Sequence, residues 1–247
     1  MNTDERRASI WERMEQPAPE PRVVLTHASI AAAAIEIADT EGLESMSIRR
    51  LARRMNLAPM GLYRYVASKE EILELMFNAA LEGGPATPDA DADWRDVLRA
   101  TAYHTREVML AHPWLGKVVT MILTGLAPNR LACFEQALTA LDGLGLDADT
   151  SMAVVDSVMD YTMGATSRDL TVLDMMRREG WESMDEMRDA YADEMSWHMS
   201  TGRYPAFERW VREGRRKDDM AWRFDYGLDC ILDGIETRLG PHARRCR

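Results

Sequence analysis

The chain has 247 residues, 46% of them hydrophobic, and a formal net charge of −11, so it can bury a substantial core and is not a disordered protein. Its longest apolar run, Ile30 to Ile35, is far shorter than the roughly 20 residues of a membrane-spanning helix, and residues 1–15 lack the apolar segment of a signal peptide. Three separated cysteines without a CxxC pair indicate neither a disulfide framework nor a zinc site, and we expect a cytoplasmic protein without metal or cofactor.

Residues 1–21 form the first segment, which ends in a run containing three prolines, Gln16 to Pro21. Proline lacks a backbone donor and favours extended backbone, so this pattern predicts a flexible N-terminal arm. The arginines of the arm alternate with acidic residues, which favours a solvated tail over a DNA contact.

Two helices are predicted next. The first begins after Thr26, a residue that can cap a helix, and ends at Gly42. The second begins after Ser47, and its periodicity directs four apolar residues inward and four arginines outward. The inward residues are Ile48, Leu51, Ala52 and Met55, and the outward arginines are Arg49, Arg50, Arg53 and Arg54.

A turn and two further helices complete this part of the chain. Asn56 tolerates the left-handed backbone conformation, so it is expected at the turn, and Pro59 suits the first turn of a short third helix. Ser68 and Glu71 have the spacing of a capping box, which predicts the start of a fourth helix.

The stretch from Ser47 to Lys69 contains five arginines, one lysine and no acidic residue. Because the whole chain carries −11 and this stretch +6, the remainder carries −17. A short basic element with a helix-turn-helix pattern inside an acidic protein is typical of a DNA-reading element. Double-stranded DNA is therefore an expected partner.

The glycine- and proline-containing residues 83–89 predict a linker, and only helices are predicted beyond it. The sequence thus predicts an all-α protein: a helix-turn-helix domain built on three helices at 22–82, and a larger helical domain for ligand binding and dimerisation at 90–240. The two long predicted helices, 147–176 and 218–239, carry broad apolar faces. The face of the second is marked by Trp222, Tyr226, Cys230, Ile231 and Ile235. The predicted helices are 92–111, 114–124, 128–143, 147–176, 183–200, 204–213 and 218–239.

The stretch from Thr26 to Leu81 resembles the N-terminal DNA-binding domain of TetR-type transcriptional repressors. The resemblance is most specific in SIRRLA at 47–52, LYRYV at 62–66 and SKEEIL at 68–73. Downstream, HPWL at 112–115, PNR at 128–130, YTMG at 161–164 and FDYGL at 224–228 resemble the C-terminal domain of the tetracycline-repressor-like branch. The resemblance implies a homodimeric repressor that leaves a palindromic operator when a small molecule enters the C-terminal domain.

The resemblance also implies which residues contact DNA. Tyr63 and Lys69 are expected to bind phosphates, helped by Ser47, and Arg49 and Arg64 are expected to read bases, because a guanidinium can bond guanine bidentately. Gly61 allows a close backbone approach. The full predicted set is Ser47, Arg49, Arg50, Pro59, Met60, Gly61, Tyr63, Arg64, Tyr65 and Lys69.

Some of these residues have a structural alternative. Tyr63 could be a core aromatic and Met60 simple packing, while Arg53 and Arg54 are more often a solvated face than base readers. Arg64 and Tyr65 stand where many family members carry other residues, so the operator sequence does not transfer.

Approximate alignment implies that five residues lie where the tetracycline-responsive member lines its pocket: Thr101, Thr105, Val119, Pro128 and Asp160. Val119 and Asp160 replace histidines there, one of them a metal ligand, so a magnesium-chelated tetracycline is not the expected effector. Eighteen methionines and the aromatics Trp114, Phe134 and Tyr161 favour an adaptable cavity for an apolar or aromatic effector. Ordinary core is the alternative, and for any single methionine it is favoured.

An enzyme is the competing class. Residues 143–148, GLGLDA, fit a dinucleotide-loop pattern only superficially, because they follow a predicted helix instead of a strand. Glu194 and His198 have metal-ligand spacing, but no second pair accompanies them. We therefore expect no catalytic residues, and keep a constitutive DNA-binding or adaptor protein without an effector as the remaining alternative.

Overall fold

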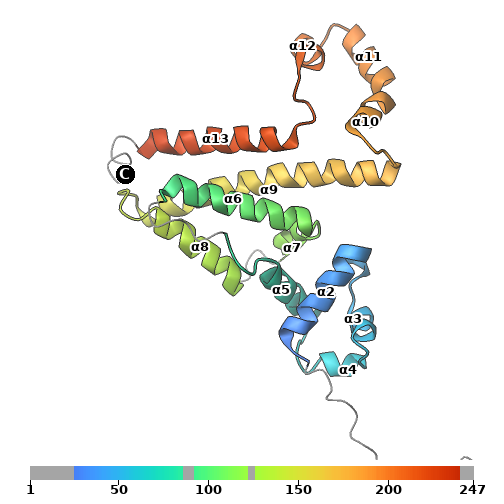
Figure 1. Ribbon diagram of the computed structural model, residues 1–247, viewed down its shortest axis with the longest axis vertical. Coiled ribbons are helices and arrows are strands. Elements are labelled where there is room, and N and C mark those ends of the chain that lie inside the picture. The colour runs from blue at the N-terminus through green and yellow to red at the C-terminus, as the bar shows by residue number, and fades with distance from the viewer. Residues whose placement is uncertain (1–24, 86–91, 122–125, 240–247) are drawn as a thin grey trace, which may run out of the picture.

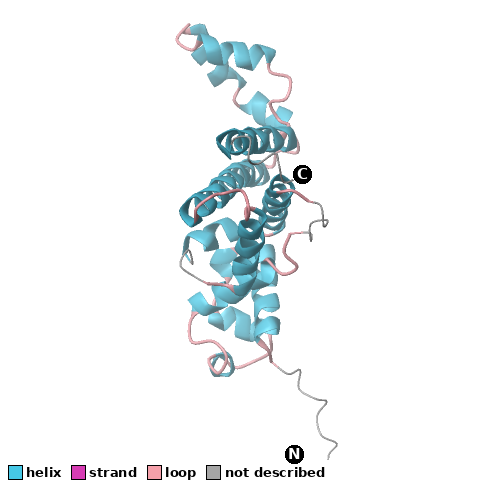
Figure 2. Ribbon diagram, turned by 90° about the vertical axis from the view of Figure 1, so that its left-hand side faces the viewer, coloured by secondary structure: helices cyan, strands magenta, loops and turns pink. Residues whose placement is uncertain are grey.

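The computed structural model describes residues 25–85, 92–121 and 126–239, without the side chains of 119–121, and these residues form helices and no strand (Figures 1 and 2). The predicted N-terminal arm and residues 86–89 of the predicted linker lie outside the described residues. None of the described helices is both long enough and apolar enough to cross a membrane.

We call residues 25–85 the N-terminal half and the described residues of 92–239 the C-terminal half. The N-terminal half contains the helices that the caps predict. Thr26 and Ser29 form a reciprocal capping box at the start of the first helix, and the Oγ of Ser47 accepts a hydrogen bond from the backbone N–H of Arg50 (3.2 Å). Asn56 has the predicted left-handed conformation, with φ 54°. The elements are α2 (His27–Glu41), the 3-10 turn η1 (Leu43–Ser45), α3 (Ile48–Arg54), α4 (Pro59–Leu62) and α5 (Lys69–Ala80).

The predicted capping box of α5 forms only in part. The Oγ of Ser68 accepts from the backbone N–H of Glu71 (3.2 Å), as predicted. The Glu71 carboxylate, however, accepts from the backbone N–H of Ala67 (2.6 Å), one residue before the cap. In a complete capping box the Glu71 carboxylate would accept from the backbone N–H of Ser68. Here it satisfies the backbone N–H of Ala67 instead.

The C-terminal half is built around α6, which packs against α8 and α9, while α9 packs against α13 (Figure 1). Gly143 and Gly145 have positive φ in the turn between α8 and α9, so GLGLDA is a helix-to-helix connection as predicted. The elements are α6 (Trp94–Ala111), α7 (Leu115–Met121), α8 (Pro128–Ala140), α9 (Ala148–Glu179), α10 (Met184–Ala190), α11 (Ala192–Ser200), α12 (Pro205–Glu213) and α13 (Met220–Leu239).

One prediction about this half is wrong. The helix predicted over 183–200 is two helices, α10 and α11, because the chain bends at Tyr191, whose ring meets that of Trp181 edge-on at 5.9 Å. The helix α13 presents part of its predicted apolar face to solvent, since Trp222, Tyr226 and Cys230 are exposed. Its buried residues are Phe224, Leu228, Leu232 and Ile235.

Two hydrophobic clusters form the core. The first joins buried residues of α2, α3, α4 and α5 to Met109, Trp114, Leu115 and Val118 of the C-terminal half. The second lies within the C-terminal half, between α6, α8, α9 and α13. Because the first cluster draws on both halves, the boundary between them is itself part of a hydrophobic core.

A buried carboxylate connects the three main helices of the C-terminal half. The Asp169 side chain of α9 is 1% exposed and lies 2.8 Å from Arg106 of α6 and 3.2 Å from Arg223 of α13. Arg106 also lies over the Phe224 ring, 4.5 Å from its centroid. A buried charge of this kind is tolerated because it is paired and hydrogen-bonded. The ion pairs therefore fix how the three helices meet.

The crossing of α9 and α13 depends on a glycine. Tyr161 donates a hydrogen bond from its hydroxyl to the carbonyl oxygen of Phe224 (2.8 Å). A Cβ atom at Gly227 would lie 2.2 Å from that hydroxyl and 2.6 Å from the adjoining ring carbon. The ring can reach the α13 backbone only because residue 227 has no side chain.

Gly227→Ala is therefore expected to lower the free energy of unfolding by about 1–3 kcal/mol, through overpacking against Tyr161. Urea denaturation of the purified protein would measure this difference. Gly234→Ala on the same helix is the matched control, because its Cβ would meet no atom within 4 Å. The control should be neutral or stabilising by up to about 1 kcal/mol, and equal destabilisation by both substitutions would contradict the clash.

Candidate nucleic-acid interface

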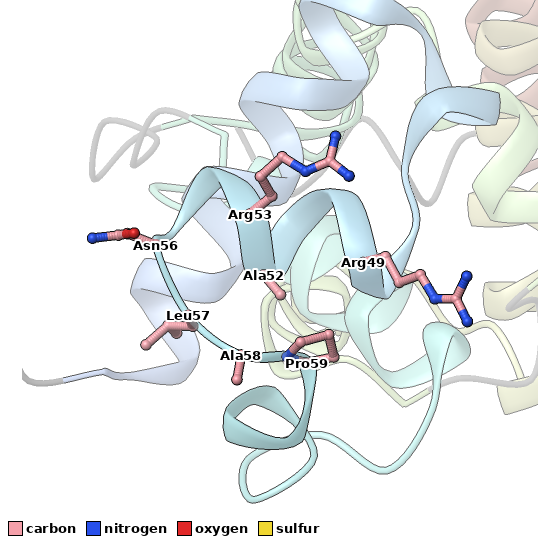
Figure 3. A pocket seen from close by; sticks show the side chains of 7 residues that line it. All are labelled: Arg49, Ala52, Arg53, Asn56, Leu57, Ala58 and Pro59. Carbon is pink, nitrogen blue, oxygen red and sulfur yellow. The ribbon is translucent and has the colours of Figure 1, made fainter.

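A shallow groove of about 580 Å³ lies between α3 and the start of α4 (Figure 3). Arg49 and Arg53 extend from α3, one helical turn apart, while Ala58 is the N-cap of α4 and Pro59 its first residue. The left-handed Asn56 reverses the chain at one end of the groove. The turn thus brings two cationic side chains of one helix beside the first turn of the next.

The four arginines of α3 divide into two pairs. Arg50 forms an ion pair with Glu41 (2.6 Å), and Arg54 forms one with Glu36 of α2. Among the described residues, no acidic group forms an ion pair with Arg49 or Arg53. Two of the four charges are therefore neutralised by the protein itself, and the two at the groove are available to a phosphate or a base.

The predicted residues at the tip of α4 face solvent. Met60 is 74% exposed and Tyr63 is 49% exposed, so neither is the core residue that the structural alternative requires. A Cβ at Gly61 would meet only the Cβ of Leu57, at 4.0 Å, so packing within the protein does not demand glycine at this position. The tip of α4 is an open surface.

The remaining predicted residues surround this tip. Arg64 and Tyr65 are exposed, and His27 Nε2 donates a hydrogen bond to the carbonyl oxygen of Tyr65 (3.0 Å), which ties the end of the motif to α2. Lys69 is the first residue of α5, and Ser47 is the N-cap of α3. The ten predicted DNA-binding residues thus lie on or beside α3, α4 and the start of α5. One of them, Arg50, is already paired with Glu41.

Four predicted effector residues lie within the C-terminal half. The Thr101 hydroxyl is buried and donates to the Val97 carbonyl oxygen of its own helix (2.9 Å), while Thr105, one turn later, is half-buried. Phe134 and Tyr161 both pack against the second hydrophobic cluster. These residues therefore come from the three helices α6, α8 and α9.

The other four do not join this group, although Val119, Pro128 and Asp160 also belong to the C-terminal half. Trp114 belongs to the first cluster, and its Nε1 donates to Asp39 of α2 (2.7 Å), so it lies at the boundary between the halves. Pro128 and Asp160 are exposed. Val119 lies in α7, and its side chain is outside the described residues.

Sequence reasoning missed the polar residues of this half. Asp169 falls on the inward stripe of α9 that Val155, Val158 and Thr162 share, and a carboxylate on such a stripe is a signal for a buried ion pair. Burial lowers the pKa of His104, whose Nε2 has no hydrogen-bond partner among the described residues.

Glu194 and His198, which have metal-ligand spacing in the sequence, are a surface pair on α11, 3.8 Å apart.

Comparison with known proteins agrees with this architecture. Residues 30–76 match the family model for bacterial regulatory proteins of the tetR family, and residues 87–239 match the model for the tetracyclin repressor-like C-terminal domain. The HTH-type transcriptional repressor DrrR1 of Streptomyces coeruleorubidus is 32% identical over 92% of this chain and 83% of its own length.

Two solved structures have a similar fold. The transcriptional regulator SCO7222, a TetR from Streptomyces coelicolor, matches with a TM-score of 0.63 and 26% identity over 85% of this chain and 97% of its own. BioQ, solved with its double-stranded DNA operator, matches with a TM-score of 0.53 and 26% identity over 64% of this chain and 94% of its own. The chain belongs to the tetR family of bacterial regulatory proteins, with a C-terminal domain of the tetracycline-repressor type.

Proposed function

We propose that this DNA-binding regulator is a homodimeric repressor that leaves a palindromic operator in the cytoplasm when a small apolar or aromatic molecule binds its C-terminal half. One observation carries the DNA-binding part: an exposed surface of α3, α4 and the start of α5 combines a helix tip with arginines that form no ion pair with any described residue. A basic surface on an otherwise acidic protein attracts DNA and also orients the encounter.

The arrangement of charges suggests separate roles. Arg49 and Arg64 are the proposed base readers, and Tyr63, Lys69 and Ser47 the proposed phosphate contacts. Arg53 joins them as a phosphate contact, because it lies one turn beyond Arg49 in the same groove and no ion pair occupies it among the described residues. The remaining proposed contacts, Pro59, Met60, Gly61 and Tyr65, lie on α4 or directly after it.

The outer faces of α9 and α13 support the dimer. The rings of Trp222 and Tyr226 lie 5.5 Å apart on the exposed side of α13, and Met152 is exposed on α9. Two long helices from each protomer can bury such faces in a four-helix interface, which by symmetry is isologous. A two-fold dimer presents two α4 helices at a fixed spacing, which is why the proposed operator is palindromic.

Repression at an operator follows the relatives. DrrR1 is named a transcriptional repressor, and BioQ was solved on an operator. The effector site proposed here lies between α6, α8 and α9, near Thr105, Phe134 and Tyr161. Their half-buried side chains suit an apolar or aromatic compound more than a charged one.

Selection from a random duplex library tests the DNA-binding proposal. The wild-type protein should enrich a palindrome at two salt concentrations, because the dimer reads two half-sites. The double variant Tyr63→Ala, Lys69→Ala should fail to bind the recovered sequence, since it lacks two proposed phosphate contacts. Failure of the wild-type protein to enrich any sequence would contradict the proposal.

Two neighbouring arginines give a matched test of the groove. Arg53→Ala should weaken operator binding and lower the slope of log K against log salt by about one unit, because one phosphate contact is lost. Arg54→Ala, which removes an arginine already paired with Glu36, should leave that slope unchanged. Fluorescence anisotropy over a salt series measures both, and equal slopes for the two variants would remove Arg53 from the interface.

Tetracycline with Mg²⁺ should leave operator affinity unchanged. Neither Val119 nor Asp160 offers an imidazole ligand, and Asp160 lies on the exposed side of α9. Anisotropy of the operator complex with and without tetracycline and MgCl₂ would measure this. Release of the operator by this pair would show that the chelate finds other ligands. A panel of apolar polycyclic compounds, tested without the metal, should contain the compounds that do release it.

A further inference from the structure

One carboxylate of the DNA-binding half holds two side chains of the C-terminal half. Asp39, on the last turn of α2, accepts hydrogen bonds from His112 Nδ1 (2.9 Å to Oδ1 and 3.0 Å to Oδ2). The same Oδ1 accepts from the indole Nε1 of Trp114 at 2.7 Å. The two donors flank Pro113 at the corner between α6 and α7, and their rings lie 5.6 Å apart.

A second polar link lies elsewhere along the boundary. Asn78 of α5 accepts from the backbone N–H of Asn129 (2.9 Å), and the Asn129 side-chain amide donates to the Asn78 carbonyl oxygen (2.7 Å). The helix α5 also packs on α7 and α8, and the shared hydrophobic cluster joins it to Leu115 and Val118 of α7. Figure 1 shows α2 and α5 beneath α7 and α8 at this boundary.

The two kinds of contact constrain the boundary differently. Apolar burial is non-directional, so the shared cluster holds the halves together without fixing their relative angle. Charge-assisted hydrogen bonds are short and directional. The Asp39 link also joins the core helix of one half to a corner that contains a fully packed tryptophan, and Trp114 is only 3% exposed. Together with the Asn78–Asn129 link, it is therefore a contact that fixes the relative angle of the two halves.

We infer that Asp39 positions each DNA-binding half on its C-terminal half and thereby sets the spacing of operator half-sites that the dimer accepts. This inference rests on the proposed homodimer and palindromic operator. The dimer fixes the two C-terminal halves, so the distance between the two α4 helices depends on the angle at each boundary. A loosened boundary lets each α4 still read its half-site, but no longer enforces one separation between them.

The experiment compares three duplexes: the recovered palindrome, the same palindrome with two base pairs inserted between its half-sites, and a single half-site. The wild-type protein should lose at least about tenfold in affinity on the insertion, because a rigid dimer cannot engage both sites at once. Asp39→Ala should lose less than about threefold on the insertion, while its single half-site affinity stays within about twofold of wild type.

Glu36→Ala is the matched control. It removes another carboxylate of α2, three residues earlier, whose partner Arg54 lies in the same half. The control should discriminate against the insertion as strongly as the wild-type protein. His112→Ala should reproduce the effect of Asp39→Ala, and the double variant should add little, since both remove the same interaction.

The outcomes separate the two proposals. If Asp39→Ala and His112→Ala discriminate against the insertion like the wild-type protein, Asp39 does not set the spacing. If Asp39→Ala weakens single half-site binding as much as palindrome binding, the residue maintains the reading half itself, and the inference is again overturned. A wild-type protein that binds the palindrome no better than the single half-site would instead contradict the proposed function.

Discussion

The hydrophobic cluster shared by the two halves is the constraint on which the structure depends. A three-helix DNA-binding unit of this size buries little apolar surface by itself, and here α5 and the end of α2 complete their cores with Trp114, Leu115 and Val118 of the other half. The DNA-binding surface is therefore not an independent module on a tether. Any change in the arrangement of α6 and α7 is transmitted to α2 and α5, because they share buried side chains.

Two buried or half-buried carboxylates add direction to this apolar framework. Asp169 holds α6, α9 and α13 around one point, and Asp39 holds the far end of α6 against α2. The helix α6 is thus held by polar contacts at two places: at Arg106 within the C-terminal half, and at its C-terminal end, His112, to the DNA-binding half. A molecule that displaced α6 within the C-terminal half would act directly on the boundary, which is the physical route by which an effector can change operator affinity.

The arginines of the basic stretch have two different roles, which the net charge does not show. The basic stretch carries six cationic residues, yet two of its arginines are neutralised by glutamates of α2. These exposed pairs link α3 to α2, while Arg49 and Arg53 at the groove form no ion pair with any described residue. Fewer cations than the sequence suggests are therefore free for DNA, and the salt dependence of binding is the quantity that counts them.

The sequence by itself determined the helical elements and the location of the basic surface, because caps, helical periodicity and an uninterrupted basic run are local signals. Thr26, Ser47, Asn56 and Pro59 mark the helix-turn-helix correctly for that reason. Only the tertiary structure decided which of two apolar stripes of α13 turns inward, where the helix over 183–200 breaks, and which arginines are paired. Each of these depends on contacts in three dimensions, such as the ion pair of Arg54 with Glu36. The contact between Asp39 and Trp114, 75 positions apart, likewise leaves no periodic trace in the sequence.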